Sequence, residues 1–358
     1  MEKENSMKKE KYVAYVSSYT MKDNHGIKIY DVDMENGRFS EWKEIEITNS
    51  SYITHSHNLK YLYSITDQGV VAFKVMEDGD LELINRASIN GMRGCFLSTD
   101  HESRFLFVGG YHDGKITVLR LNEDGSVGEI TEEIFHKGIG SVAERNFRPH
   151  VNCVKMTRDN KYLCAADLGM DHVNVYRLNH ETGRLTQVDV VRSELESAPR
   201  HLVFSTDGKF MYVVHELKNY IEVYTYEERD HNPYFEKIQR ISTIDSNNNS
   251  GVAASALKFS WDHEYLLSSN AGDNSVILYN VDHKEGTLEE ILCLPISGEY
   301  PKDAALFPDC RHLVSLNHES DSLTFFTVHV EDKVIVMNGP ELPVDKPNCV
   351  LFHKVISE

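Results

Sequence analysis

Short hydrophobic strands alternate with polar turns along most of the chain, and the alternation repeats. Residues 157–178, 205–226 and 260–281 show the unit most clearly. Each has a turn built on Asp with Asn, Gly or His, a strand that opens on an aromatic residue, a second polar turn, and a further strand that ends near an aromatic residue. Strands of this length between such turns indicate β-structure, and their recurrence indicates a repeat protein.

The spacing of the repeat predicts its architecture. The residues that open the second strand of each unit are Tyr61, Phe105, Tyr162, Phe210, Tyr265 and His312. They are separated by 44 to 57 residues. Periods of this size, made of short strands, are typical of propeller blades and too long for solenoid turns.

A seventh unit is divided between the two ends of the chain. Residues 12–20 and 26–47 resemble the later strands of a blade and lack its first strand, which residues 349–356 can supply. Pairing these ends closes the ring and removes a free sheet edge. We therefore predict an all-β fold, a seven-bladed propeller, as a single domain over residues 12–358, preceded by a disordered polar tail at residues 1–11.

Composition narrows the choice of partners. The chain has 37 basic and 56 acidic residues, a net charge of −19, which argues against nucleic acid or an anionic membrane as partner. No apolar run reaches the roughly 18 residues that span a bilayer. The six cysteines show no disulfide or metal spacing, which favours a reducing cytoplasm, and we expect no metal and no cofactor.

The repeat also predicts where a binding site lies. Inner strands begin, and second strands end, at the same rim of the channel. Counting back along the inner strands predicts a ring of Asn152, Arg200, Ser255 and Lys302, with Arg93 or Gly94 in a further blade. The ends of the second strands add Tyr111, Asp167, His215, Glu216, Asn270, Asn317 and His318.

This rim combines cations with a carboxylate, which suits the hydrolysis of an ester or lactone. Arg200 can stabilise an oxyanion, and Glu216, His150 or His215 can act as the base. Three of these residues can instead have a purely structural role. Arg200 can clamp loop carbonyls, Glu216 can merely neutralise Arg200, and His150 can be a packing residue. The Asp/Asn/Gly turns at the other end of the strands are ordinary hairpin chemistry.

At these same segments the sequence resembles the propeller-type lactonase family, which includes bacterial 6-phosphogluconolactonases and the fungal carboxymuconate lactonising enzyme. The resemblance is carried by RPHVN, AADLGMDHVNVY, APRHLVFSTDGKFMYVVHELKN and YPKDAALFPD. It implies a seven-bladed cytoplasmic propeller without an obligatory metal, with a site at the channel mouth that uses His, Arg and Glu. Arg200, Glu216 and His150 match its motifs.

Three blades depart from the family pattern. Asn152 stands where a histidine is expected, Ala256 and Lys258 replace a carboxylate and a following His or Arg, and Lys302 replaces an arginine. These departures leave the fold prediction intact and bear on the substrate.

The leading hypothesis is a lactonase that converts 6-phosphogluconolactone to 6-phosphogluconate in the pentose phosphate pathway. Glu216 or His150 would activate water and Arg200 would stabilise the oxyanion. We expect the lactone and its phosphate to be bound by Lys302, Lys258, Asn152, His215 and Asn270. The alternatives are a cycloisomerase acting on a dicarboxylate and a non-catalytic propeller that serves as a binding scaffold.

Overall fold

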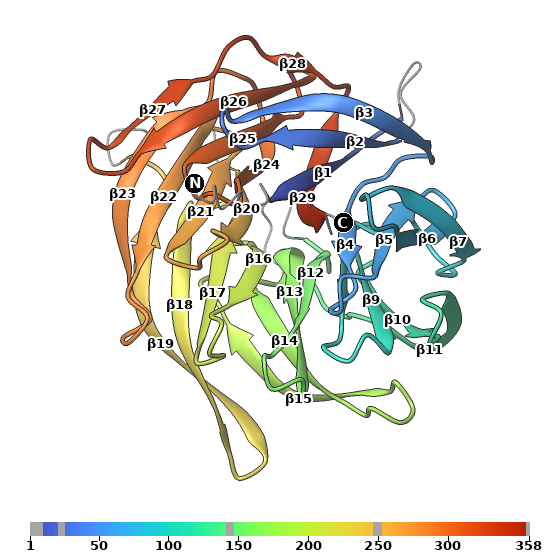
Figure 1. Ribbon diagram of the computed structural model, residues 1–358. Helices are drawn as coiled ribbons and strands as arrows, with labels where there is room; N and C mark the ends of the chain where they lie inside the picture. The colour runs from blue at the N-terminus through green and yellow to red at the C-terminus, as the bar shows by residue number, and fades with distance from the viewer. Residues whose placement is uncertain (1–9, 21–25, 141–146, 246–252, 356–358) are drawn as a thin grey trace, which may run out of the picture.

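The chain folds into seven antiparallel β-sheets arranged around a common axis (Figure 1). The structure, a computed structural model, describes residues 10–20, 26–140, 147–245 and 253–355. The predicted seven-bladed propeller is confirmed. In the described ranges the one helical segment is the short 3-10 turn η1 (Leu168–Met170), and no helix has the length and apolar character to cross a membrane.

Six of the blades follow one another along the chain. The first three contain β4 (Ile53–His55), β5 (Tyr61–Thr66), β6 (Gly69–Val75) and β7 (Leu81–Ala87); β8 (Phe96–Thr99), β9 (Phe105–Gly110), β10 (Lys115–Leu121) and β11 (Val127–Phe135); and β12 (Val151–Met156), β13 (Tyr162–Asp167), β14 (His172–Leu178) and β15 (Leu185–Arg192). The next three contain β16 (Pro199–Phe204), β17 (Phe210–His215), β18 (Tyr220–Arg229) and β19 (Asn232–Ser242); β20 (Ala254–Phe259), β21 (Tyr265–Asn270), β22 (Ser275–Val281) and β23 (Leu288–Pro295); and β24 (Pro301–Leu306), β25 (His312–Asn317), β26 (Ser322–His329), β27 (Val334–Met337) and β28 (Leu342–Pro343).

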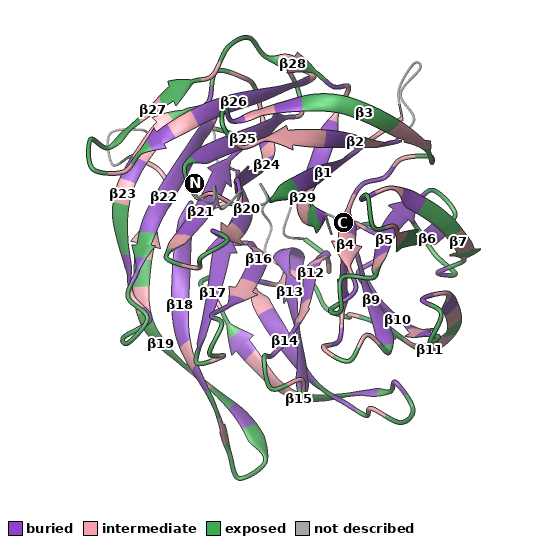
Figure 2. Cartoon of the chain, in the orientation of Figure 1, coloured by how far each residue is buried: buried purple, intermediate pink, exposed green. Residues whose placement is uncertain are grey.

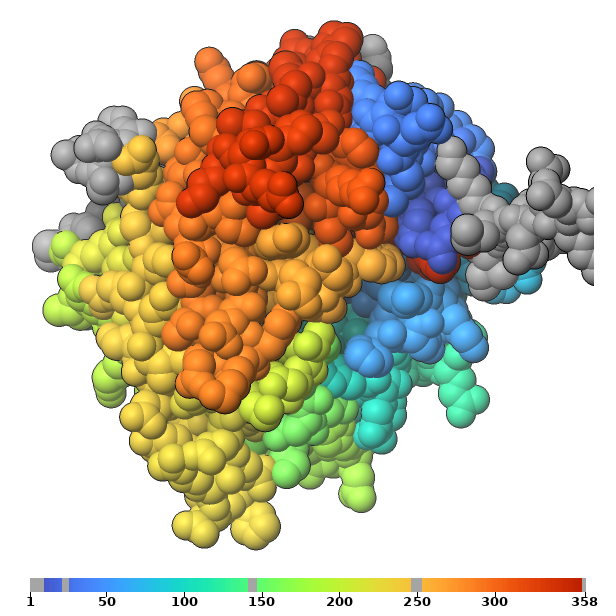
Figure 3. Space-filling view, turned by 60° about the vertical axis from the view of Figure 1, so that its left-hand side comes forward, coloured from blue at the N-terminus to red at the C-terminus, as the bar shows by residue number. Residues whose placement is uncertain are grey.

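The seventh blade joins the two ends of the chain, as predicted. It contains β29 (Pro347–Val355), β1 (Lys11–Ser18), β2 (Gly26–Asp33) and β3 (Arg38–Glu46) in that order. The pairing of β29 with β1 runs from Ser18 opposite Pro347 to Lys11 opposite Val355. In the space-filling view the blue N-terminal and red C-terminal segments lie against each other (Figure 3). Of the predicted tail, residues 1–9 lie outside the described residues, and Lys11 already belongs to β1.

All six second strands begin at the predicted residue, and their turns show why. In the turn before β13, Thr157 Oγ1 donates to Asp159 Oδ1 at 2.6 Å and accepts the N–H of Tyr162 at 3.1 Å. The hydroxyls of Ser205 and Ser260 make the same pair of bonds before β17 and β21. The aromatic residue is thereby fixed as the first residue of its strand.

Neighbouring blades pack through apolar side chains, and only the outermost strands are largely exposed (Figure 2). At several of these blade junctions a buried tyrosine hydroxyl donates to a backbone carbonyl of the adjacent blade. Tyr63 Oη donates to Gly125 O at 3.1 Å, and Tyr212 Oη donates to Gly286 O at 2.9 Å. Both glycines have a positive φ, and a Cβ there would lie 2.2 Å from an aromatic ring of the adjacent blade. These turns therefore require glycine.

A β-bulge near the start of the inner strand recurs in five blades. The pairing skips Asn152 in β12, Arg200 in β16, Lys302 in β24 and Asn348 in β29. In β20 it skips the two residues between Ala254 and Leu257. Because a bulged residue leaves the regular alternation of faces, its side chain can be turned toward the axis. The predicted ring is built on these bulges.

Candidate active site

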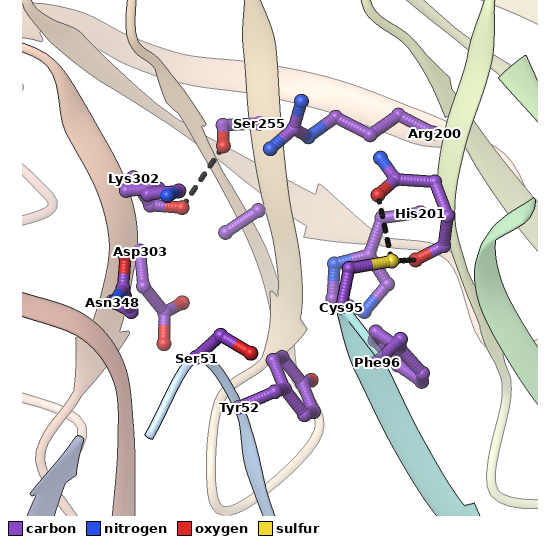
Figure 4. A pocket seen from close by; sticks show the side chains of 12 residues that line it. Ser51, Tyr52, Cys95, Phe96, Arg200, His201, Ser255, Lys302, Asp303 and Asn348 are labelled. Carbon is purple, nitrogen blue, oxygen red and sulfur yellow. Dashed lines mark hydrogen bonds between the residues drawn. The ribbon is translucent and has the colours of Figure 1, made fainter. Parts of the chain in front are cut away.

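Two adjoining cavities open at the end of the propeller where the inner strands begin. The outer cavity has a volume of about 260 Å³ and the inner one about 60 Å³. Both are lined by Ser51, Cys95, Asn152, Arg200 and Lys302. Figure 4 shows Arg200 and Lys302 reaching into this space from different strands, with Ser255 between them. The structure therefore brings the predicted ring together at one mouth.

Arg200 and Glu216 form an ion pair at the outer cavity. Arg200 comes from the bulge of β16 and Glu216 follows β17 directly, where its backbone N–H donates to Ala198 O at 2.8 Å. The Arg200 side chain retains 20% of its exposure and that of Glu216 only 2%. Burial alone would lower the pKa of Arg200, but the Glu216 carboxylate outweighs burial and raises the pKa. The guanidinium thus stays charged beside the cavity.

Lys302 occupies the same mouth without a carboxylate partner in the described ranges. Its Nζ lies 4.8 Å from the centre of the Tyr19 ring, and its backbone oxygen accepts from Ser255 Oγ at 2.9 Å. Burial, followed by the positive charge of Arg200, lowers the pKa of Lys302 to about 7. Lys302 therefore gains or loses its charge near neutral pH, and an anion bound beside it would favour the charged form.

Asn348 is a site residue that the sequence reasoning missed. It is 4% exposed and lines the inner cavity, and in the described part of the chain neither its Oδ1 nor its Nδ2 has a hydrogen-bond partner. A buried amide without partners is costly, so this side chain is suited to a polar ligand or a water. One signal was available: Pro347 precedes Asn348 just as prolines precede Arg200 and Lys302.

Three predicted residues lie behind the cavity walls. His150 is buried, with Nδ1 2.6 Å from Tyr111 O and its ring stacked on that of Tyr111. His215 is fully buried, with Nδ1 3.0 Å from Ser197 Oγ. Asn270 Nδ2 donates to Ser275 Oγ at 3.0 Å. None of these three side chains lines either cavity, whereas Tyr111 and Glu216, which directly follow second strands, line the outer one.

Lys258 does turn inward, but its charge is already neutralised. Its Nζ lies 2.5 Å from Asp303 Oδ2 and donates to Val350 O at 2.9 Å. It lines neither cavity at this mouth. Asn152, by contrast, lines both, and its Oδ1 lies 3.5 Å from Cys95 Sγ. Burial raises the pKa of the Cys95 thiol to about 12, so the thiol is neutral and poorly nucleophilic.

One group of potential metal ligands occurs among the described residues, away from these cavities. It comprises Asp100, Glu102 and His180. Asp100 Oδ1 already accepts the backbone N–H groups of Arg104 and Phe105 at 2.6 and 2.7 Å. This carboxylate is therefore engaged in closing its own turn.

Comparison with known proteins agrees with this architecture. Residues 13–352 match the model of the family described as Lactonase, 7-bladed beta-propeller. The chain is 30% identical over 352 residues to the 6-phosphogluconolactonase of Bacillus subtilis, which covers 96% of this chain and 99% of the relative. It is 32% identical over 329 residues to an uncharacterized protein of Staphylococcus saprophyticus, covering 89% and 92% of the two chains.

The fold is also similar to that of a protein of known structure. The periplasmic gluconolactonase of Pseudomonas aeruginosa superposes with a TM-score of 0.89 at 26% sequence identity, covering 96% of this chain and 99% of that chain. The family match extends over nearly all of the propeller, including both terminal strands of the shared blade. The chain therefore belongs to the lactonase family of seven-bladed β-propellers and is a lactone-hydrolysing enzyme.

Proposed function

We propose that this protein hydrolyses 6-phosphogluconolactone to 6-phosphogluconate. The observation that carries the proposal is the meeting of the Arg200–Glu216 ion pair and the unpaired cation Lys302 in one cavity of about 260 Å³. This is enough room for a small sugar lactone. The similarity to the Bacillus subtilis enzyme supports the same substrate.

Hydrolysis of a lactone requires an activated water and stabilisation of the oxyanion that forms at the carbonyl oxygen. In our proposal the Glu216 carboxylate takes a proton from water, and the water oxygen attacks the lactone carbonyl carbon. The Arg200 guanidinium stabilises the resulting oxyanion. The ring C–O bond then breaks, and Glu216 passes the proton to the departing alkoxide oxygen, which becomes a hydroxyl group. The Arg200–Glu216 contact holds both groups in position before substrate binds.

The remaining groups of the mouth bind the substrate. Lys302 faces the cavity with no competing carboxylate in the described ranges, so we assign it to the phosphate group. Arg93 lines the same cavity, although its guanidinium also contacts Asp67 at 3.1 Å. The amides of Asn152 and Asn348 are suited to sugar hydroxyls, which both donate and accept hydrogen bonds. His150 is proposed to support this wall through its stacking on Tyr111.

We also propose that the reaction takes place in the cytoplasm, within the pentose phosphate pathway. All six cysteines are free thiols, and three of them are buried. A chain with six thiols and no disulfide suits a reducing compartment. Nothing in this site needs a cofactor, because activated water and one oxyanion contact suffice for an already reactive lactone.

A second candidate is the unphosphorylated lactone, favoured by the similarity to the Pseudomonas aeruginosa gluconolactonase. The two candidates differ in their need for Lys302. Initial rates on freshly prepared 6-phosphogluconolactone and on gluconolactone, each corrected for spontaneous hydrolysis, should show a preference for the phosphorylated substrate that Lys302→Met removes. Equal rates on both substrates, unchanged by Lys302→Met, would favour gluconolactone. No rate above the spontaneous one would favour the scaffold reading, and turnover of a dicarboxylate instead would favour the cycloisomerase.

A further inference from the structure

A separate cavity lies where the inner strands end, at the opposite mouth of the propeller. Its volume is about 280 Å³. Strand β12 links the two mouths: Asn152 lies near its start, and Met156 and the following Arg158 line the second cavity. The second cavity shares no lining residue with either cavity at the first mouth. It is therefore distinct from the proposed active site.

The charged and titratable side chains that line this cavity are all basic. Lys155 and Arg158 supply two cations, and the imidazoles come from His55, His57, His101 and His263. None of its lining residues is acidic, although the chain carries 56 acidic and 37 basic residues. Within the described ranges, neither Lys155 nor Arg158 has a salt-bridge partner. Burial lowers the pKa of His55 to about 3 and also lowers the pKa of His101 and His263, so the positive charge at neutral pH comes chiefly from Lys155 and Arg158. Two cations in a lining without carboxylates favour an anion.

The charges are close enough to act on one another. Burial, followed by the charges of His57 and Arg158, lowers the pKa of His101. Burial also lowers the pKa of Lys155, and the nearby charges of Lys258 and Arg158 act in the same direction. Repulsion of this kind opposes folding, and a bound anion would relieve it. Two carboxylates outside the lining partly offset this repulsion: Asp100 acts on His101 and Asp262 acts on His263, each raising the pKa of the imidazole by less than burial lowers it.

The cavity is also held in place by contacts between blades. The rings of His57 and His101, from adjacent blades, stack with their centres 4.9 Å apart. The backbone N–H of His57 donates to Ser103 Oγ at 3.0 Å, and that of His101 donates to Asn160 Oδ1 at 2.9 Å. The inner wall contributes His55, whose ring centre lies 5.3 Å from that of His353 in the shared blade. Side chains of three blades thus fix the shape of this cavity.

We propose that this second cavity is a binding site for a small anion bearing a phosphate group. The Arg158 guanidinium offers a planar fork for phosphate oxygens, Lys155 offers a point charge, and the imidazoles of His57 and His101 line the same cavity. Inorganic phosphate and a phosphate monoester share this chemistry. The site is independent of the proposed lactonase reaction, because none of its residues lines the active-site cavities.

Titration of the full-length protein with inorganic phosphate, at pH 7 and constant ionic strength, tests the proposal. Side-chain nitrogen spectra would report the site through His57 and His101, and calorimetry would give its affinity. We expect both resonances to shift with phosphate in the wild type. Arg158→Gln and Lys155→Met should each weaken this binding at least tenfold. Arg158 is exposed on a turn, so its replacement should fold normally. Arg86→Gln, on the exposed face of β7, is the matched control and should bind as the wild type does.

The source of the phosphate is distinguished by a second titration, with glucose 6-phosphate and with glucose. Equal affinities for glucose 6-phosphate and inorganic phosphate would assign the site to the phosphate group alone, whereas tighter binding of the monoester would assign it to a phosphorylated metabolite. Glucose should cause no shift. Arg158→Gln should keep wild-type lactonase activity in phosphate-free buffer. Unmoved His57 and His101 resonances, or an Arg158→Gln protein that binds phosphate like the wild type, would overturn the proposal.

Discussion

Replacement of Lys302 by methionine should stabilise the fold while weakening the binding of a phosphorylated substrate. The pKa of Lys302 is lowered from its usual 10.5 to about 7, so the unfolded chain binds a proton more readily than the folded one between these values. The charged lysine therefore destabilises the folded state by the full amount below pH 7, and this destabilisation decreases as the pH rises from 7 toward 10.5.

The size of the effect can be worked out from this difference in pKa. Each pH unit is worth ~1.4 kcal/mol, which gives an upper bound of about 5 kcal/mol below pH 7. Because Lys302 borders an open cavity, solvent screening reduces this value, and we expect roughly 2–3 kcal/mol. The free energy of unfolding of Lys302→Met should therefore exceed that of the wild type by roughly 2–3 kcal/mol at pH 6.5. This difference in free energy should be smaller at pH 9.5.

Urea unfolding at several pH values, without phosphate in the buffer, measures this difference. Lys74→Met, at an exposed position of β6, is the matched control and should show no pH-dependent gain. A Lys302→Met protein whose stability relative to the wild type is the same at pH 6.5 and pH 9.5 would refute the reasoning. In that case Lys302 would keep an ordinary pKa and stay charged up to about pH 10, and the predicted change in phosphate binding near pH 7 would lose its basis.

Four further predictions concern the site and the ring. Arg200→Gln should lower kcat/KM on 6-phosphogluconolactone by about 10²-fold or more through loss of the oxyanion contact; an unchanged kcat would remove Arg200 from that role. Glu216→Gln keeps the shape of the side chain but removes its proton affinity, so kcat should fall about 10²-fold or more; full activity with an unshifted pH profile would leave Glu216 only as a partner of Arg200. Because Lys302 is charged below about pH 7, KM for the phosphorylated lactone should rise as the pH increases above 7, whereas KM for gluconolactone should not; parallel KM profiles would argue against the phosphate contact. Deletion of the chain from Pro347 onward should remove β29, expose the edge of β1 and cause aggregation on size-exclusion chromatography; a monomer with an unchanged Tm would contradict the closure.

The fold could be predicted in detail because each blade repeats the same local chemistry. In the turns before β13, β17 and β21 a Ser or Thr hydroxyl bonded to an Asp fixes the following aromatic residue as the strand start, which is why Tyr162 and Phe210 were placed correctly. The two halves of the shared blade could be paired because each lacks what the other supplies. These signals are local or repeated, so they can be recognised in the sequence without knowledge of tertiary contacts.

The site was only partly predictable, because it depends on which way individual side chains turn. Arg200 and Lys302 were found by counting along strands, but the bulges that aim them at the axis are marked only by the proline before each of them, which does not by itself predict a bulge. His215 ends a second strand at the correct rim, yet its ring turns toward Ser197. The free amide of Asn348 and the neutralisation of Lys258 by Asp303 both arise from contacts between distant segments, which spacing alone does not reveal.

The most direct test of the central claim is the rate of lactone opening on freshly prepared 6-phosphogluconolactone, followed by proton release and corrected for spontaneous hydrolysis. The wild type should accelerate this reaction strongly and should prefer it to gluconolactone. Arg200→Gln should lose at least about 10²-fold in kcat/KM, and Lys302→Met should lose the preference for the phosphorylated lactone. A wild-type protein that leaves the spontaneous rate unchanged, under conditions where the Bacillus subtilis enzyme is active, would contradict the account.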